Sequence, residues 1–270
     1  MSTVTAFYDA LAEDYHLNYV DWQGAVRRHG RTLSLLIQEQ LGVTARTVLD
    51  CSCGIGTQAI GLALEGHTVT GTDISLRSIE RARREAGAFQ VDVDFIVADF
   101  RALGDVATGE FDVVISCDNS LPHLLTDDDI LLALQNMKAR LRPGGMLIIG
   151  IRDYDEIVRT RPRATPPQIV DQVDERSLLF QVWDWSEDAR WYDLSLFVVK
   201  SDGGGWRTDC HTTRYRALQR DDLDRFIVDA GFIDAAWHVP DKTGHHQPLL
   251  TGRRPDDSSI SRQTAASPFG

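Results

Sequence analysis

Between residues 46 and 152, apolar runs typical of strands alternate with stretches of helical periodicity, and this pattern predicts strands that alternate with helices. The apolar runs predict strands at residues 47–51, 67–72, 93–97, 111–116 and 145–151. The amphipathic stretches between them predict helices at residues 57–65, 75–87, 101–105 and 127–141. Such an alternation indicates a mostly parallel sheet with helices on both faces. Residues 111–116 are almost wholly apolar, as expected of a strand buried on both faces.

A helical cap is predicted before this core, which we place at residues 46–158. Residues 1–45 repeat aliphatic and aromatic side chains every three to four positions, among them Tyr8, Tyr15, Tyr19 and Trp22. These aromatic residues either pack into the core or form a flap that closes over a bound ligand.

An inserted antiparallel β lobe is predicted after the core, at residues 159–218. It starts with a proline-rich loop at residues 160–168, and Gly203-Gly204-Gly205 joins its last two strands as a hairpin. The three expected strands are residues 177–185, 190–200 and 206–218. Residues 219–254 then return to the core as one helix and two closing strands. The polar tail at residues 255–270 has no periodicity, and we expect it to be disordered.

The most informative segment is the turn after the first predicted strand, Val48-Leu49-Asp50-Cys51-Ser52-Cys53-Gly54-Ile55-Gly56-Thr57. Its glycines let the backbone approach a ligand closely, and the N–H groups of the following helix face that ligand. The next apolar run ends in Asp73, seventeen residues past Gly56, and this carboxylate can accept hydrogen bonds from both hydroxyls of a ribose. We therefore predict a nucleoside site on a Rossmann-like α/β fold.

The glycine spacing also suits a dinucleotide, so neighbouring charges must decide which nucleoside binds. Asp50 precedes the turn, where it would repel a pyrophosphate and attract an α-amino group. Asp99 ends the third strand, where it can accept from an adenine amino group. No Lys or Arg lies between Val48 and Arg77 to pair with a phosphate. These residues favour a phosphate-free adenosine derivative over NAD.

Taken together, residues 46–152 resemble the class I S-adenosylmethionine-dependent methyltransferases. The resemblance implies S-adenosylmethionine as the cofactor, with its methionine part on Gly54 and Gly56, its ribose on Asp73 and its adenine on Asp99. It also implies that the cap covers the cofactor and that Arg28 pairs with its carboxylate, with Arg27 and Arg31 as alternatives. The cofactor-binding residues predicted in this way are Tyr8, Tyr19, Trp22, Arg28, Asp50, Cys51, Gly54, Gly56, Asp73, Ile74, Asp99, Phe100 and Cys117.

A narrower resemblance concerns Cys117-Asp118-Asn119-Ser120-Leu121-Pro122-His123-Leu124 and Arg152-Asp153-Tyr154-Asp155-Glu156-Ile157. Both segments are similar to motifs of the glycine and sarcosine N-methyltransferases. The resemblance implies that Asn119 and Arg152 hold an amino-acid substrate, with Tyr154 nearby and the arginine on the carboxylate. Arg152 could instead form a structural ion pair with Asp153 or Asp155. His123 is either a general base or the partner in a structural hydrogen bond.

Asp118 stands where these relatives have glycine, and the lobe after residue 160 matches them weakly, so the acceptor stays open. We expect methyl transfer to the nitrogen of a small amino acid or amine. The alternatives are an O- or C-methyltransferase for a specialised metabolite, a protein that binds the cofactor without transferring methyl, and an NAD-dependent dehydrogenase. His245 and His246 are expected to be solvated loop residues, and Arg214 or Arg216 could line the pocket.

Composition and net charge argue against some classes of binding partner. A net charge of −12 argues against non-specific binding to nucleic acid or to an anionic membrane. Cys51 and Cys53 have the C-x-C spacing of some metal sites, but no second pair completes one, so we expect free thiols, no metal and a reducing cytoplasm. We find neither a signal pattern nor an apolar run of about 18 residues. The expected partner is a small-molecule acceptor, and a homo-oligomer stays open.

Overall fold

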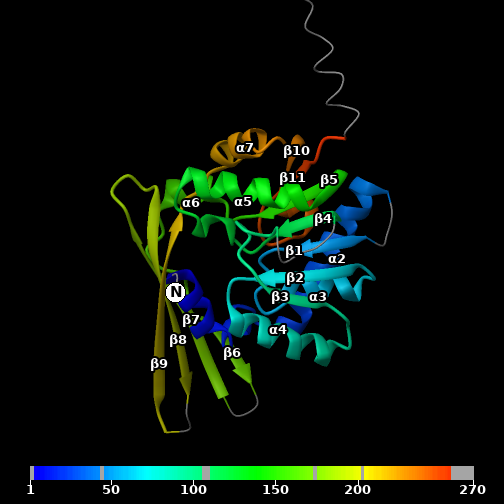
Figure 1. The fold of residues 1–270 in the computed structure, drawn as a ribbon. Helices are drawn as coiled ribbons and strands as arrows, with labels where there is room; N and C mark the ends of the chain where they lie inside the picture. The colour runs from blue at the N-terminus through cyan, green and yellow to red at the C-terminus, as the bar shows by residue number, and fades with distance from the viewer. Residues whose placement is uncertain (1–2, 43–45, 105–109, 173–174, 202–203, 257–270) are drawn as a thin grey trace, which may run out of the picture.

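The computed structural model describes residues 3–42, 46–104, 110–172, 175–201 and 204–256, and these form two sheets with flanking helices (Figure 1). The larger sheet has seven strands in the order β10-β11-β5-β4-β1-β2-β3. Their bounds are β1 Thr47–Asp50, β2 Thr68–Asp73, β3 Asp94–Val97, β4 Phe111–Ser116, β5 Leu141–Gly150, β10 Ile233–His238 and β11 Leu249–Arg253. All pairs from β5 to β3 are parallel, whereas β11 pairs antiparallel with β5 and β10. This arrangement confirms the predicted α/β fold class.

The strand order reverses between β1 and β4, because the chain runs from β1 through β2 to β3 on one side and continues with β4 and β5 on the other. Loops at the carboxyl ends of the strands diverge at such a point and leave a crevice, where ligands bind in open α/β sheets. The fold therefore places its site beyond the ends of β1 and β4.

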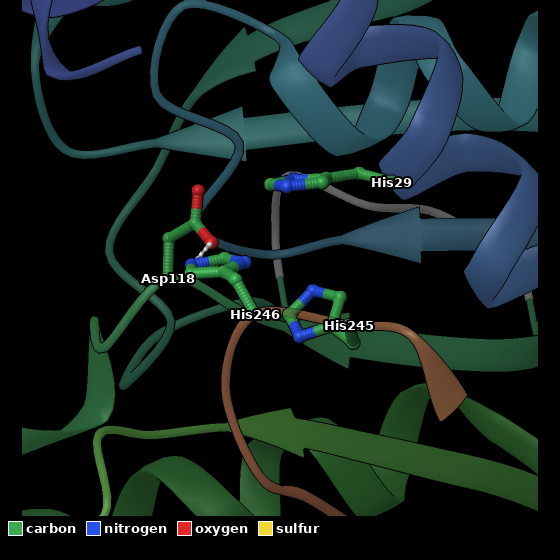
Figure 2. Close-up of side chains that lie close together, drawn as sticks. All are labelled: His29, Asp118, His245 and His246. Carbon is green, nitrogen blue, oxygen red and sulfur yellow. Dashed lines mark ion pairs between the residues drawn. The ribbon is translucent and has the colours of Figure 1, made fainter. Parts of the chain in front are cut away.

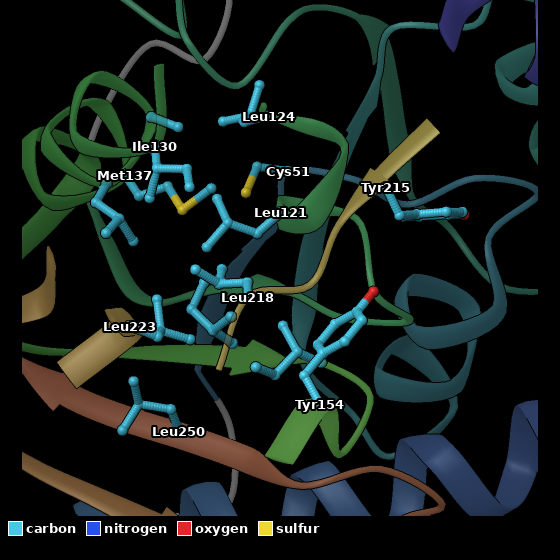
Figure 3. Packing of buried hydrophobic residues seen from close by; sticks show 14 of the residues in the cluster. Cys51, Leu121, Leu124, Ile130, Met137, Tyr154, Tyr215, Leu218, Leu223 and Leu250 are labelled. Carbon is cyan, nitrogen blue, oxygen red and sulfur yellow. The ribbon is translucent and has the colours of Figure 1, made fainter. Parts of the chain in front are cut away.

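Helices cover both faces of this sheet and enclose two apolar clusters. The helices α2 Trp22–Leu41, α3 Thr57–Leu64 and α4 Leu76–Phe89 pack on one face. The helices α5 Asp127–Arg140 and α7 Arg220–Asp229 pack on the other, where Leu121, Ile130 and Met137 lie in a continuous core with Leu223 and Leu250 (Figure 3). No helix among the described residues is both long and apolar enough to cross a bilayer.

The lobe is a four-stranded antiparallel sheet in the order β6-β7-β8-β9, and it stands beside the larger sheet (Figure 1). Its strands are β6 Gln168–Gln172, β7 Glu175–Trp185, β8 Trp191–Ser201 and β9 Trp206–Arg216. Alternate residues of β8, from Tyr192 to Val198, are buried on its inner face. The first helix, α1 Thr3–Leu11, packs against both β9 and α4 and so bridges the lobe and the core.

Five local features differ from expectation or fall outside the described residues. Of the helix expected at residues 101–105, the described residues 101–104 form turn and irregular structure, in which the Arg101 side chain folds back onto Asp99. Helix α6 Tyr154–Thr160, where the Asp153 carboxylate accepts from Glu156 N as an N-cap, was not predicted, and neither was β6 at the end of the expected loop. The antiparallel pairing of β8 with β9 up to Ser201 and Trp206 confirms the expected hairpin, of whose turn residues 202–203 lie outside the described residues, as do residues 257–270 of the expected tail. The remaining short elements are η1 Tyr15–Asn18, η2 Leu121–His123 and α8 Pro240–Thr243.

Candidate active site

A cavity of about 400 Å³ opens beyond the carboxyl ends of β1, β2, β3 and β4. The turn after β1 provides one wall, and the residues after β2 and β3 provide the next. The segment that follows β4 closes the third side, from Asp118 to Thr126. Val4, Tyr8 and Tyr15 of the cap cover the cavity, so the cap lies over the crevice that the strand order creates.

Asp73 fixes the shape of the glycine turn. One of its carboxylate oxygens accepts from the Gly54 N–H at 2.9 Å, and the other accepts from the Ser75 N–H at 2.9 Å. Gly54 has a φ of +53°, and no atom lies within 4 Å of the place where its Cβ would be, so a ligand can lie against its backbone. Burial raises the pKa of Asp73 to about 6. The remaining lone pairs of this carboxylate face a cavity that suits hydroxyl donors.

The other two acids at strand ends have different surroundings. Asp50 is 1% exposed, and burial raises its pKa to about 8, with the nearby charges of Asp73 and Asp118 adding to the effect. One Asp50 oxygen accepts from Ser52 N at 3.3 Å, and the other has no hydrogen-bond partner within the described part of the chain. Burial alone would raise the pKa of Asp99, but the Arg101 guanidinium lowers it below its ordinary value through bonds of 2.6–3.1 Å.

A second, smaller cavity of about 60 Å³ shares Tyr8, Tyr15 and Asp118 with the first. Arg152 lies in its wall, with its guanidinium over the ring of Trp183 at 4.9 Å and over that of Tyr215 at 5.4 Å. The Tyr192 and Gln181 side chains accept its hydrogen bonds at 2.8 and 3.4 Å.

Arg152 forms no ion pair within the described part of the chain. Among the described residues, no Asp or Glu oxygen lies within 4.0 Å of its guanidinium nitrogens. Asp153 and Asp155, the alternative partners expected from the sequence, pair instead with Arg220 at 2.9 and 3.5 Å. The wall of the small cavity therefore carries a positive charge with which no carboxylate of the described residues pairs directly.

The other predicted substrate residues surround Arg152. Asn119 is buried, has a φ of +68°, and its side-chain oxygen accepts from the Arg152 backbone N–H at 3.1 Å. The Tyr154 hydroxyl lies 3.0 Å from that of Tyr192. His123 lines the large cavity between the Tyr8 hydroxyl at 2.8 Å and the Thr213 hydroxyl at 3.4 Å, and burial lowers its pKa to about 3. A neutral imidazole with both nitrogens engaged fits a positioning role better than that of a base.

Known proteins are similar to parts of this sequence. Residues 48–145 match the profile of a family described as a methyltransferase domain. The chain is 34% identical over 139 residues to the glycine/sarcosine N-methyltransferase of Parasynechococcus marenigrum, covering 52% of this chain and 48% of that one. It is 36% identical over 128 residues to the glycine N-methyltransferase of Rattus norvegicus, covering 42% of each. The chain thus spans about half the length of these curated relatives or less.

Solved structures extend the likeness to the whole fold. An S-adenosylmethionine-dependent methyltransferase from Clostridium acetobutylicum aligns with a TM-score of 0.72 at 16% identity, over 92% of this chain and 99% of that one. The amino pentose methyltransferase CalS10 from Micromonospora echinaspora, solved with S-adenosylmethionine bound, aligns with a TM-score of 0.69 at 18% identity, over 89% and 94%. The chain therefore carries a methyltransferase domain at residues 48–145, on the fold of the class I S-adenosylmethionine-dependent methyltransferases.

S-adenosylmethionine is therefore the cofactor of this methyltransferase, and the large cavity fits it. Asp73 would take the ribose, since its carboxylate faces the cavity while held by Gly54 and Ser75. The open space over Gly54 would admit the methionine part. Arg101, the arginine in this wall, is already occupied by Asp99 and Asp129, which agrees with a cofactor that carries no phosphate.

The structure brings seven of the predicted cofactor residues to the large cavity and places six others elsewhere. Those that line it are Tyr8, Cys51, Gly54, Asp73, Ile74, Asp99 and Phe100. Those that do not are Tyr19, Trp22, Arg28, Asp50, Gly56 and Cys117. Trp22 packs behind the wall and donates to the Thr57 hydroxyl at 3.3 Å, whereas Arg28 is exposed and pairs with Asp21 at 3.8 Å.

Several residues in both walls of the methyltransferase site were not predicted from the sequence. Thr57, Gln58 and Arg101 line the large cavity, and Gln181 lines the small one. The alternation of the lobe strands was a usable signal, because Trp183, Tyr192 and Tyr215 are the inward positions that surround Arg152. Arg214 and Arg216 line neither cavity, since they pair with Asp193 and Asp127.

Proposed function

We propose that this methyltransferase transfers the methyl group of S-adenosylmethionine to the amino nitrogen of a small amino acid whose carboxylate pairs with Arg152. The observation that carries the proposal is the guanidinium in the wall of the small cavity, which lacks a carboxylate partner among the described residues. A partly buried charge is stable when a counter-ion reaches it. A carboxylate can take two parallel hydrogen bonds from one guanidinium, which also orients the molecule that bears it.

The size of the small cavity supports a small acceptor. It measures about 60 Å³, and one water-sized group needs roughly 10–15 Å³, so it has room for about four to six such groups. Glycine, with five non-hydrogen atoms, is a molecule small enough for this space. The cavity meets the cofactor cavity at Asp118, Tyr8 and Tyr15, so a nitrogen two bonds from the carboxylate would point toward the cofactor.

The reaction asks the protein chiefly to position the acceptor. The cofactor supplies an electrophilic methyl group on a sulfonium, and it leaves as a neutral thioether that needs no acid. Asn119 holds the Arg152 backbone, while Trp183 and Tyr215 confine its guanidinium, so the carboxylate site is rigid. Tyr8 and Tyr15 of the cap cover the junction of the two cavities and would exclude water from it. The two curated relatives compared above are named as methyltransferases of glycine or sarcosine, which supports this choice of acceptor.

The test compares matched acceptors with and without a carboxylate. S-adenosylhomocysteine release is measured with glycine, sarcosine and alanine, and with methylamine, ethanolamine and an aminosugar. We expect turnover with the amino acids and kcat/KM values at least about 100-fold lower with the amines, since a charge-assisted bidentate pair contributes roughly 3–5 kcal/mol. Equal turnover of methylamine, or a preference for the aminosugar, would contradict the proposal.

Arg152→Met is the decisive variant. We expect its KM for the amino acid to rise about 100-fold while the Kd for S-adenosylhomocysteine stays within about twofold of the wild-type value. Arg190→Met is the matched control, because Arg190 also belongs to the lobe and stacks on a tryptophan, yet it lines neither cavity. Parallel losses of cofactor and acceptor binding in Arg152→Met would remove its assigned role.

A further inference from the structure

Three histidines and one aspartate converge beside the junction of the two cavities (Figure 2). His29 comes from α2, Asp118 follows β4, and His245 and His246 lie in the loop between α8 and β11. One ligand atom from each of the four residues lies within 4.8 Å of every other. The fold therefore gathers four metal-ligating side chains from three distant parts of the chain.

His245 shows that packing alone does not explain this cluster. The side chain is 2% exposed, and its Nε2 has no hydrogen-bond partner in the described structure. Leaving such a buried polar atom unsatisfied costs roughly 1–3 kcal/mol. Its Nδ1 lies 3.1 Å from the Gln247 carbonyl oxygen and 3.3 Å from the Gln247 backbone nitrogen, so Gln247 holds this side of the ring. A metal ion on Nε2 requires the tautomer in which Nδ1 carries the proton and donates to that carbonyl oxygen.

Asp118 is also held by a hydrogen bond from outside the cluster. One of its carboxylate oxygens accepts from the Tyr19 hydroxyl at 2.6 Å, which leaves the other directed at the histidines, 3.3 Å from His246 Nε2. His29 stacks on His246 with 4.7 Å between ring centres, and its Nδ1 lies 3.3 Å from the Gln58 side-chain nitrogen. Hydrogen bonds outside the cluster thus hold three of its members, with Tyr19, Gln58 and Gln247 as the supporting residues.

The donor set identifies the class of ion. Three imidazole nitrogens and one carboxylate oxygen suit Zn²⁺ and neighbouring divalent transition metals, whereas Mg²⁺ and Ca²⁺ prefer oxygen ligands. Bonds of about 2.0–2.1 Å in a tetrahedron put neighbouring donors roughly 3.4 Å apart. The Asp118–His246 pair already has this spacing, and the other donors lie within 4.8 Å of one another, so the His29 and His245 side chains would rotate to complete a tetrahedron.

We propose that His29, Asp118, His245 and His246 bind one divalent transition-metal ion of the zinc class. With four protein ligands the site is closed, so its role is positional. It joins helix α2 and the α8–β11 loop to the segment after β4, whose Asp118 lines both cavities. This inference concerns the protein's own side chains and does not depend on which acceptor is methylated.

The primary test measures metal binding without an activity assay. The full chain, free of any affinity tag, is dialysed against a chelator and titrated with Zn²⁺ by calorimetry and with Co²⁺ by visible absorption. We expect one equivalent of Zn²⁺, a rise in Tm on binding, and the intense d–d bands of tetrahedral Co²⁺ without the near-ultraviolet charge transfer of thiolate ligands. Wild-type protein that takes up less than half an equivalent, or a thiolate spectrum, would overturn the proposal.

Single variants then assign the ligands. His245→Ala and His246→Ala should each weaken Zn²⁺ binding at least about 100-fold and abolish the rise in Tm. His238→Ala is the control, because His238 is a half-buried histidine on β10 that bonds to Thr251 outside the cluster. His245→Gln and His246→Gln repeat the test with more conservative changes if the alanine variants fold poorly by circular dichroism. Unchanged Zn²⁺ affinity in the folded variants would refute the assignment.

Discussion

Replacing Asp73 by asparagine tests the cofactor site most directly, because it removes one charge and one acceptor atom while it keeps the shape of the side chain. The two carboxylate oxygens accept from Gly54 N and Ser75 N, each at 2.9 Å. An amide must turn its NH2 group toward one of these two donors. One bond that shapes the glycine turn is then replaced by two facing N–H groups, and the ribose loses an anionic acceptor.

The loss can be estimated from these contacts. Hydrogen bonds to a charged partner contribute roughly 1.5–3 kcal/mol each, against roughly 0.5–1.5 kcal/mol for neutral ones. With one bond lost and the others weakened, binding of the cofactor product falls by roughly 2–4 kcal/mol. That corresponds to an increase of about 30- to 700-fold in Kd.

Calorimetric titration with S-adenosylhomocysteine measures this change without turnover. Asp92→Asn is the matched control, since Asp92 is an exposed aspartate in the loop between α4 and β3. Circular dichroism confirms that both variants are folded before titration. If the Kd of Asp73→Asn stays within about threefold of the wild-type value, or if Asp92→Asn weakens binding equally, the ribose assignment of Asp73 is wrong.

The pKa of Asp73 is raised to about 6, so acid protonates the carboxylate that must accept from the ribose. The Kd for S-adenosylhomocysteine should therefore rise up to about tenfold per pH unit below pH 6, and Asp73→Asn should lose that dependence. Burial raises the pKa of Asp50 to about 8, so the folded state keeps a proton that the unfolded chain releases near pH 4. The free energy of unfolding should therefore fall by up to about 1.4 kcal/mol per pH unit as the pH rises from about 4 to about 8. Thermal melts of Asp50→Asn should show a smaller fall, and stability curves parallel to those of the wild type would refute this prediction. Gly30→Ala should lower Tm by several degrees, because a Cβ there overlaps the Gly61 backbone where α2 and α3 touch. Gly87→Ala, in open space on α4, should instead raise the free energy of unfolding by about 0.5–1 kcal/mol. An unchanged Tm in Gly30→Ala would refute the close packing of the two helices.

The core and the large cavity could be predicted well from the sequence, because local patterns determine both. Strand and helix periods differ, and glycine marks the turn after β1, so the pattern alone places Gly54 and Asp73 at one edge of the sheet. The missed helix α6 has only seven residues, too few to show a period, and its N-cap at Asp153 is a single side-chain contact. Arg101 folding onto Asp99 is likewise a local contact that no apolar pattern reports.

Other parts of the site depend on which face of a helix a residue occupies and on contacts between residues far apart in the sequence. The buried positions of α2 include Val26, His29 and Leu33, which put Arg28 on the outer face. That same periodicity could have corrected the choice of Arg28 as a cofactor ligand. The convergence of His29 and Asp118 with the loop after α8 had no such signal, because sequence separations of 89 residues and more leave no motif.

The walls of the two cavities come from different stretches of the chain. The cofactor cavity is built mostly from turns between residues 51 and 129, whereas Gln181, Leu194, Leu196 and Tyr215 of the lobe complete the small one. Under the proposed function, mutations in the lobe strands would therefore change which acceptor binds and leave the walls of the cofactor cavity in place. On the same proposal, replacing the lobe between α6 and α7 by that of another protein would give enzymes that methylate other acceptors with the same cofactor.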